Sequence, residues 1–225
     1  MTRVVLTDIE GTIADIDFVR QVLFPYARQA LPDFIRTHHD APEVAVQLDA
    51  VAAEAGLPAD DHEALIAQLQ AWIDADRKIT PLKALQGMVW KAGYEQGDFT
   101  AHLYPDAHAA LKAWHEAGVP LYVYSSGSIQ AQRLYFAHTD FGDISAWFRG
   151  FFDTTSGGKK DAESYRRIAG EIGVEPGGMV FLSDVVEELD AAREAGLKTV
   201  QICRPGTNPT VDHPHYPDLS TLELD

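Results

Sequence analysis

The stretch that decides the fold is Val4-Val5-Leu6-Thr7-Asp8-Ile9-Glu10-Gly11-Thr12, an apolar run that leads directly into two carboxylates one residue apart. This pattern is typical of a buried strand that ends in an acidic loop, where Gly11 lets the chain turn sharply. In open α/β sheets, ligands bind just beyond the carboxyl ends of the strands. The stretch therefore predicts a site in which Asp8 and Glu10 hold a hard cation and a phosphate together.

Four further short apolar runs predict strands along the chain. They lie at residues 121–124, 150–152, 179–182 and 199–202. Most are continuously apolar, which is typical of a parallel sheet that is covered on both faces. Helical patterns separate the runs, and this alternation indicates βαβ units. The sequence thus predicts an α/β fold with a Rossmann-like parallel sheet.

A long helical segment interrupts this alternation after the first predicted strand. Roughly ninety residues, 15 to 105, carry only helical periodicity, which is far more than one crossover connection needs. Apolar stripes predict four helices there, with a kink or break at Pro25 in the first and an end at Gly93 in the fourth. We therefore expect a core domain formed by residues 1–14 and 106–225 and an inserted helical domain formed by residues 15–105.

The composition limits the class of protein. Of the 225 residues, 46% are hydrophobic, which is enough for a real core and excludes disorder. The formal charge of −16 argues against a nucleic-acid partner, because phosphate backbones are bound by clustered lysine and arginine. No apolar run reaches the length of a membrane span, and a single cysteine, Cys203, excludes an intramolecular disulfide. We expect a cytoplasmic monomer without membrane partners, in which an anionic substrate needs a local source of positive charge.

Polar residues follow three of the later predicted strands. Ser125-Ser126-Gly127-Ser128 offers N–H groups and hydroxyls for a phosphate, although an ordinary N-cap is the commoner use of such a turn. Gly157-Gly158 leads to Lys159, a possible point charge on phosphate, with Lys160 beside it. Asp184 suits either a Mg²⁺ ligand or a helix cap. Each signal alone is weak, and their order at successive strand ends carries the weight.

This series of motifs resembles the haloacid dehalogenase superfamily of phosphatases, and the inserted helices stand where that family has a cap domain. The resemblance narrows to the enolase-phosphatases of methionine salvage, because Glu10 stands where most of the superfamily has a second aspartate. Five further stretches share it: Leu23-Phe24-Pro25-Tyr26, Leu82-Lys83-Ala84-Leu85-Gln86-Gly87, residues 124–128, Glu163-Ser164-Tyr165-Arg166 and Arg204-Pro205-Gly206. The matches cover nearly the whole chain and imply a Rossmann-like haloacid dehalogenase core with an all-helical cap after the first strand.

The resemblance also implies roles for the acids. Asp8 would be the nucleophile, which splits one difficult hydrolysis into two steps. Glu10 would protonate the leaving oxygen and then activate the water that breaks the phosphoenzyme. One Mg²⁺ per subunit would be held by Asp8, Asp184 and either the backbone carbonyl or the side chain of Glu10, whose extra methylene relative to aspartate leaves both possibilities open.

Three residues would bind the transferring phosphoryl group: Ser125, Ser126 and Lys159. Lys160 competes with Lys159 for this role, although the family's spacing favours Lys159. Glu188 would orient neighbouring groups of the site. In the cap, Lys83 and Gln86 would select the tail of the substrate, although a surface charge is an equally good interpretation of Lys83.

The implied substrate is a small phosphorylated diketone, 2,3-diketo-5-methylthiopentyl-1-phosphate, which would be enolised and then dephosphorylated to 1,2-dihydroxy-3-keto-5-methylthiopentene. The sequence does not identify the base for enolisation, and Glu10 is only a candidate. The alternatives are a phosphatase for another small ester, a carbon–halogen hydrolase and a catalytically silent binding module. His213 and His215 lack a third ligand, so we expect a flexible surface loop there rather than a metal site.

Overall fold

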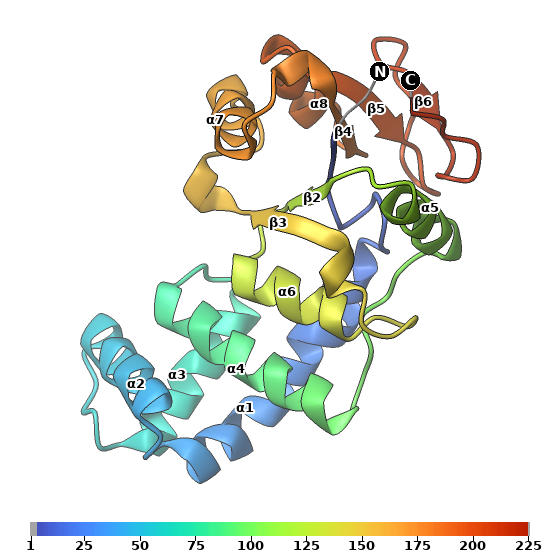
Figure 1. The fold of residues 1–225 in the computed structure, drawn as a ribbon. Helices are drawn as coiled ribbons and strands as arrows, with labels where there is room; N and C mark the ends of the chain where they lie inside the picture. Colours follow the sequence, from blue (N-terminus) through green and yellow to red (C-terminus); the bar gives the residue numbers. More distant parts are fainter. Residues whose placement is uncertain (1–3, 225) are drawn as a thin grey trace. The chain divides into compact units, whose positions relative to one another are not determined.

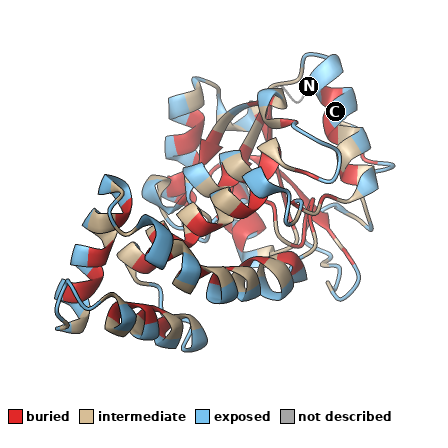
Figure 2. Cartoon of the chain, turned by 90° about the horizontal axis from the view of Figure 1, so that it is seen from below, coloured by how far each residue is buried: buried red, intermediate tan, exposed pale blue. Residues whose placement is uncertain are grey.

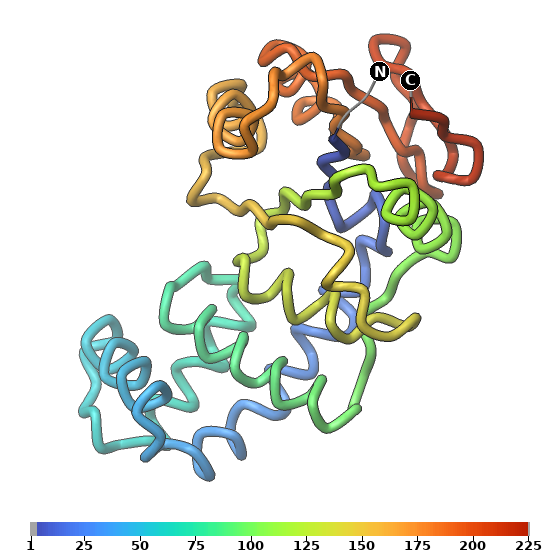
Figure 3. The backbone as a smooth tube through the Cα atoms, viewed as in Figure 1, coloured from blue at the N-terminus to red at the C-terminus, as the bar shows by residue number. Residues whose placement is uncertain are grey.

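The structure is a computed structural model that describes residues 4–224, and it divides into two compact units. The first, here called the sheet unit, takes in the chain up to Ile16 and again from Thr100 onward. The second, the helical unit, is Asp17–Phe99. Figure 3 traces the chain from the first strand into the helical unit and back into the sheet unit. Among residues 4–224, no helix is both long and apolar enough to cross a membrane.

Six strands form one sheet in the order β3-β2-β1-β4-β5-β6 (Figure 1). They are β1 (Val4–Thr7), β2 (Leu121–Tyr124), β3 (Phe148–Phe152), β4 (Met179–Ser183), β5 (Lys198–Ile202) and β6 (His215–Tyr216). Every neighbouring pair is parallel, and Val5 of the fully buried β1 pairs with Leu121 on one side and Val180 on the other. The predicted parallel α/β core is confirmed. Strand β6 was not predicted, because two residues are too few to show a period.

Helices cover both faces of the sheet. The sheet unit contains α5 (Pro105–Glu116), α6 (Ile129–Ala137), α7 (Ala162–Ile172) and α8 (Val186–Glu194), with 3₁₀ turns at Ser145–Trp147, Thr154–Ser156 and Pro176–Gly178. On one face, Leu6 of β1 packs with Tyr165 of α7 and Leu189 of α8 in a single buried cluster. On the other, α5 contacts β2 and α6 contacts β3 (Figure 1). This arrangement brings the carboxyl ends of the parallel strands to one edge of the sheet.

The helical unit packs its helices around a core of its own. It consists of a π-helical turn (Val19–Leu23), α1 (Phe24–His38), α2 (Pro42–Ala55), α3 (His62–Asp74) and α4 (Thr80–Gln96). Each of the four α-helices buries one face (Figure 2). Residues such as Leu31, Leu69 and Leu85 meet in one apolar cluster. The hydrogen-bond pattern changes just before Pro25, which lies in the first turn of α1, where a missing N–H donor costs nothing.

The prediction that Gly93 ends the fourth helix is wrong. The helix continues to Gln96 and ends at Gly97, whose φ of 76° is the left-handed conformation common after helices. Gly93 lies inside the helix because two aromatic rings pack directly against its backbone. A Cβ atom there would come within 2.5 Å of Phe99 and 2.7 Å of Tyr26, so glycine is needed for packing rather than for termination.

Candidate active site

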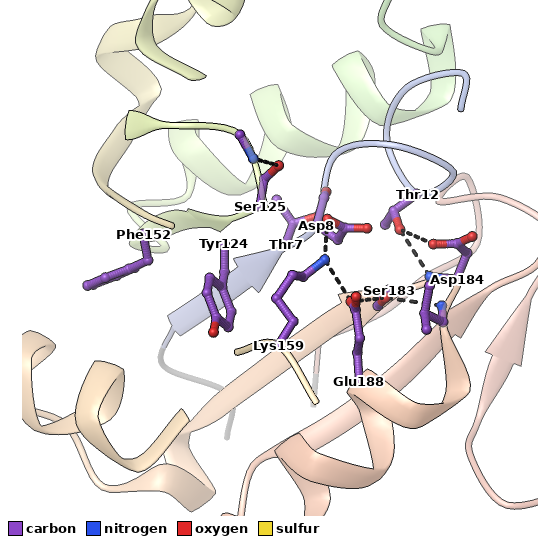
Figure 4. A network of polar contacts seen from close by, with 12 residues as sticks. Thr7, Asp8, Thr12, Tyr124, Ser125, Phe152, Lys159, Ser183, Asp184 and Glu188 are labelled. Carbon is purple, nitrogen blue, oxygen red and sulfur yellow. Dashed lines mark hydrogen bonds and ion pairs between the residues drawn. The ribbon is translucent and has the colours of Figure 1, made fainter. Parts of the chain in front are cut away.

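Five of the predicted site residues lie close to the carboxyl ends of the central strands in Figure 4, namely Asp8, Ser125, Lys159, Asp184 and Glu188. Asp8 directly follows β1, and its N–H still donates to the carbonyl of Leu182 in β4 at 2.9 Å. Ser125 directly follows β2, and its N–H donates to the carbonyl of Phe152 in β3 at 3.2 Å. Both residues are buried. Because each backbone is hydrogen-bonded to a neighbouring strand, the sheet fixes the position from which each side chain projects.

Lys159 lies between two carboxylates in the centre of the site. Its Nζ is 2.6 Å from Oδ1 of Asp8 and 2.7 Å from Oε2 of Glu188, and its side chain is 8% exposed. Burial alone would lower the pKa of Lys159, but the two carboxylates outweigh it and hold the pKa above its usual range. Lys160 is 63% exposed and lies 3.8 Å from Glu187. The geometry therefore brings Lys159, and not its neighbour, to the acids.

Two tyrosines hold the loop that carries Lys159, and the sequence analysis assigned them no role. The hydroxyl of Tyr165 in α7 donates to the carbonyl of Lys159 at 2.6 Å, and that of Tyr124 in β2 donates to the carbonyl of Gly157 at 2.9 Å. Gly157 has a φ of 122°, and a Cβ atom there would clash with Oγ of Ser164. A buried tyrosine needs a partner for its hydroxyl, and this requirement was the signal available in the sequence.

Asp184 is held against the acidic loop by Thr12. Its backbone N–H donates to Oγ1 of Thr12 at 3.1 Å, and the same hydroxyl lies 3.4 Å from Oδ1 of Asp184. Gly11 has a φ of 80°, and a Cβ atom there would come within 2.5 Å of Oδ2 of Asp184. Glycine is therefore required at this position for two reasons, the left-handed backbone and the close approach of the carboxylate.

Glu188 is anchored by the residue that ends β4. Oγ of Ser183 donates to Oε2 of Glu188 at 3.0 Å and accepts the N–H of Val185 at 3.1 Å. The same Glu188 oxygen is the one that contacts Lys159. Glu188 thus links the start of α8 to the lysine, and the orienting role predicted for it stays a prediction.

The carboxyl groups of the site repel one another. Burial, with the charge of Asp8 adding to it, raises the pKa of Glu10 to about 7, although Lys159 opposes the shift. Burial and Asp8 likewise raise the pKa of Asp184 to about 6, and they raise the pKa of Glu188. A single buried lysine does not balance this group of acids. The site therefore has an excess of negative charge, and the group best suited to neutralise it is a cation.

The turn after β2 divides its predicted roles between different serines. Ser128 is the N-cap of α6, because its Oγ accepts the N–H of Ala131 at 3.2 Å. Ser125 comes before the cap and is buried, and its Oγ accepts the N–H of Gly127 at 3.2 Å. Ser126 is exposed. Capping therefore accounts for Ser128 alone and leaves Ser125 and Ser126 for the predicted phosphate contacts.

The sequence of this chain is similar to those of a known protein family. A family model of haloacid dehalogenase-like hydrolases matches residues 2–196. The chain is 59% identical over 213 residues to enolase-phosphatase E1 of Xylella fastidiosa (strain M23), which covers 95% of this chain and 91% of that protein. It is 61% identical over 203 residues to enolase-phosphatase E1 of Stenotrophomonas maltophilia (strain K279a), with 90% and 87% covered. The chain belongs to the enolase-phosphatase family. The resemblance seen in the sequence is confirmed, and the protein is a phosphatase of the haloacid dehalogenase type.

Solved structures support the same fold. The crystal structure of the UTR4 protein of Saccharomyces cerevisiae matches with a TM-score of 0.83 at 33% identity and covers 99% of this chain and 100% of that chain. L-2-haloacid dehalogenase of Xanthobacter autotrophicus matches with a TM-score of 0.57 at 16% identity, with 98% and 96% covered. The latter similarity shows only a shared fold.

The acids of this enolase-phosphatase family member fit a Mg²⁺ ion better than a metal that needs several protein ligands. Within residues 4–224, no three His, Cys, Asp or Glu side chains converge as a metal-binding group. Mg²⁺ is commonly bound by one or two carboxylates together with water and substrate phosphate. Asp8 and Asp184 supply two carboxylates, and the missing side chain at Gly11 leaves room for the carboxylate of Asp184 beside the acidic loop.

The two predicted specificity residues lie in the helical unit, in α4. Lys83 is exposed and Gln86 is buried. Their proposed contacts with a substrate stay a prediction.

The prediction of a surface loop around the histidine pair is wrong for His213. Its Nδ1 lies 2.7 Å from Oγ1 of Thr199, and its Nε2 lies 3.1 Å from Oδ1 of Asp190. The pairing of β6 with β5 brings the preceding residues against the sheet, which buries His213 and leaves His215 exposed. His213 therefore ties the C-terminal segment to β5 and α8.

Proposed function

We propose that this phosphatase is a Mg²⁺-dependent enolase-phosphatase that converts 2,3-diketo-5-methylthiopentyl-1-phosphate to 1,2-dihydroxy-3-keto-5-methylthiopentene and phosphate in methionine salvage. The observation that carries the proposal is the group formed by Asp8, Lys159 and Glu188, with Asp184 closing it at the neighbouring strand end. Relatives that are 55% to 61% identical to this chain and bear the name enolase-phosphatase support the choice of substrate.

Asp8 is the proposed nucleophile. One of its carboxylate oxygens attacks phosphorus, the ester P–O bond breaks, and an aspartyl-phosphate forms. Lys159 contacts Oδ1 of Asp8 at 2.6 Å, which holds the carboxylate in a fixed orientation. Since phosphoryl transfer depends mainly on positioning and electrostatics, this contact supplies much of what the chemistry requires.

Glu10 is the proposed proton carrier. It protonates the leaving oxygen and later takes a proton from the water that hydrolyses the aspartyl-phosphate, which restores both carboxyl groups. Its position two residues after the nucleophile, at the same strand end, supports this role. For the enolisation, Glu10 is also our candidate base at the carbon that bears the phosphate ester.

Ser125 and Ser126 bind the transferring phosphoryl group with hydroxyl and N–H groups, and Lys159 adds its charge. Asp8, Asp184 and either the backbone carbonyl or the side chain of Glu10 would hold Mg²⁺, and the ion would supply positive charge to the phosphoryl group and act as a Lewis acid toward the carbonyl oxygens. The helical unit has the sequence position of the family's cap domain, and we propose that Lys83 and Gln86 select the methylthio tail.

The decisive experiment follows the ultraviolet absorbance of the diketone phosphate in the presence of Mg²⁺ while phosphate release is measured in parallel. We expect an enediol signal coupled to phosphate release, loss of both in excess EDTA, and loss of phosphate release in Asp8→Asn with an unchanged circular dichroism spectrum. Phosphate release without any enol signal, or equal rates on simple sugar phosphates, would reduce the activity to that of another small-ester phosphatase. Turnover in Asp8→Asn would overturn the choice of nucleophile.

A further inference from the structure

Arg204 is a buried arginine that contacts the acidic loop from the far end of the chain. Its side chain is 7% exposed, and its Nη1 and Nη2 bind the carboxylate of Asp106 in α5 at 2.9 and 2.8 Å. Its Nε donates to the carbonyl of Thr12 at 2.9 Å, and its guanidinium lies over the ring of Tyr104 with 4.0 Å to the centroid. The acidic loop and the start of α5 therefore meet on one planar cation.

Thr12 connects this cation to Asp184. The carbonyl of Thr12 accepts from Arg204, while its hydroxyl accepts the backbone N–H of Asp184 at 3.1 Å and lies 3.4 Å from the carboxylate of that residue. Thr12 is fully buried, so water does not compete for these bonds. An unbroken series of contacts thus runs from Asp106 through Arg204 and Thr12 to Asp184.

The C-terminal segment joins the same series at both ends. The N–H of Leu219 donates to Oδ2 of Asp106 at 2.9 Å. Independently, Nε2 of the buried Gln201 lies 3.3 Å from the carbonyl of Asp184, and its Oε1 accepts the N–H of Thr210 at 2.8 Å. Residues beyond β5 are therefore bonded directly to the carboxylate of Asp106 and, through the side chain of Gln201, to the backbone of Asp184.

We propose that Arg204 is a positioning residue for the phosphatase reaction, which acts through Thr12 to set the Asp184 carboxylate at the distance from Asp8 that a divalent cation requires. Burying a guanidinium costs free energy unless its charge is paired, and packing of the apolar core does not require a charge at this position. The fixed fork of arginine lets it bind a carboxylate with two nitrogens and a carbonyl with a third, which the single ammonium of lysine cannot reproduce. The proposal rests on the proposed metal-dependent function.

The test is Arg204→Lys, which keeps the charge but loses the fork. We expect a ~10–100-fold weaker affinity for Mn²⁺, measured without substrate by electron paramagnetic resonance, because residues that orient metal ligands have effects of this size. The Mg²⁺ concentration for half-maximal phosphate release should rise by the same factor. Thr12→Val, which removes the hydroxyl, should weaken Mn²⁺ similarly, and Thr12→Ser should restore it. Since both changes break one series of contacts, the double variant should lose less than the product of the two factors.

Arg193→Lys is the matched control. Arg193 also binds a carboxylate, that of Asp190 at 2.6 Å, and a carbonyl of the C-terminal segment, that of Asp212 at 2.9 Å, but it is half-exposed and makes no contact with Thr12. Its metal affinity should equal that of the unchanged protein. Folded Arg204→Lys or Thr12→Val with unchanged Mn²⁺ affinity would overturn the proposal, even if either variant melts earlier. If the unchanged protein itself releases phosphate fully in EDTA, the proposed function fails instead.

Discussion

Replacing Lys159 by methionine tests the charge balance of the site most directly. Methionine fills a similar volume but removes the ammonium that lies 2.6 Å from Asp8 and 2.7 Å from Glu188. The two carboxylates, which are 4% and 11% exposed, are then left close together without a cation between them. We expect Lys159→Met to lose both stability and phosphate release.

The size of the loss follows from the geometry. At an effective dielectric constant of about 20, each of the two ion pairs has a gross attraction of roughly 6 kcal/mol. Burying the three charges costs several kcal/mol per ion, which offsets most of this attraction. Breaking a buried pair on one side typically costs ~3–5 kcal/mol, because the partner charge stays buried and unpaired. For a chain of 225 residues, this corresponds to a melting temperature lower by roughly 6–20 °C.

Lys160→Met provides the control next to it in the chain. Lys160 is 63% exposed and 3.8 Å from Glu187, and exposed ion pairs of this kind contribute about 0–1 kcal/mol. Both variants are compared by thermal unfolding in EDTA, followed by circular dichroism, and by phosphate release in Mg²⁺. Lys159→Met should also lose ~10²–10³-fold in turnover, the range observed when one stabilising donor is removed. If the two variants melt together, or if Lys160→Met alone loses turnover, the assignment of the buried lysine is refuted.

Three further predictions address the surroundings of the acids. Gly11→Ala should lower the free energy of unfolding by ~1–3 kcal/mol, measured in urea, because its φ is 80° and its new Cβ would lie 2.5 Å from a carboxylate oxygen; a neutral effect would contradict the geometry. Tyr165→Phe removes the 2.6 Å bond to the Lys159 carbonyl and should lower kcat more than it raises KM, whereas an altered KM alone would speak against positioning of the lysine. In Asp106, burial opposes ionisation, but the bonds from Arg204 and a backbone N–H outweigh it and lower the pKa. A lowered pKa in the folded state stabilises the protein above the unfolded value of about 3.9, and this stabilisation is lost as the pH falls through the folded pKa. Asp106→Asn should therefore be less stable than the unchanged protein at pH 7 and nearly equal to it near pH 2. A stability difference that does not change with pH would refute the pairing.

The sequence predicted the sheet and the position of the site because both depend on local patterns. An apolar run that ends in polar residues marks the end of a parallel strand, and all such ends meet at one edge of the sheet. The apolar pattern could not decide between Lys159 and Lys160, since both follow the same strand and a shift of one residue changes only which side chain turns inward. The structure separates them by burial.

Contacts between segments that are distant in the sequence could not be predicted from local patterns either. The bond from Arg204 to Thr12 joins residues 192 positions apart, and neither residue has a neighbour in the sequence that suggests the other. Gly93 shows the converse case. A glycine near the end of a helical pattern predicts the helix end, but here the rings of Tyr26 and Phe99 pack where a Cβ atom would lie. Local rules therefore predicted elements and strand ends, while the bonds that fix the site's geometry required the fold.

The formal charge of −16 means that a phosphorylated substrate approaches a protein that repels it, unless the site itself is positive. Lys159 alone does not make it so, because its charge is already shared by Asp8 and Glu188. The raised pKa values of Glu10 and Asp184 indicate that burial and the charge of Asp8 disfavour further negative charge in the site. In the proposed function, attraction for a phosphate would therefore come from backbone N–H groups after β2 and from the proposed Mg²⁺. Under the proposed function, the bound cation would offset the charge of the same acids that repel the substrate.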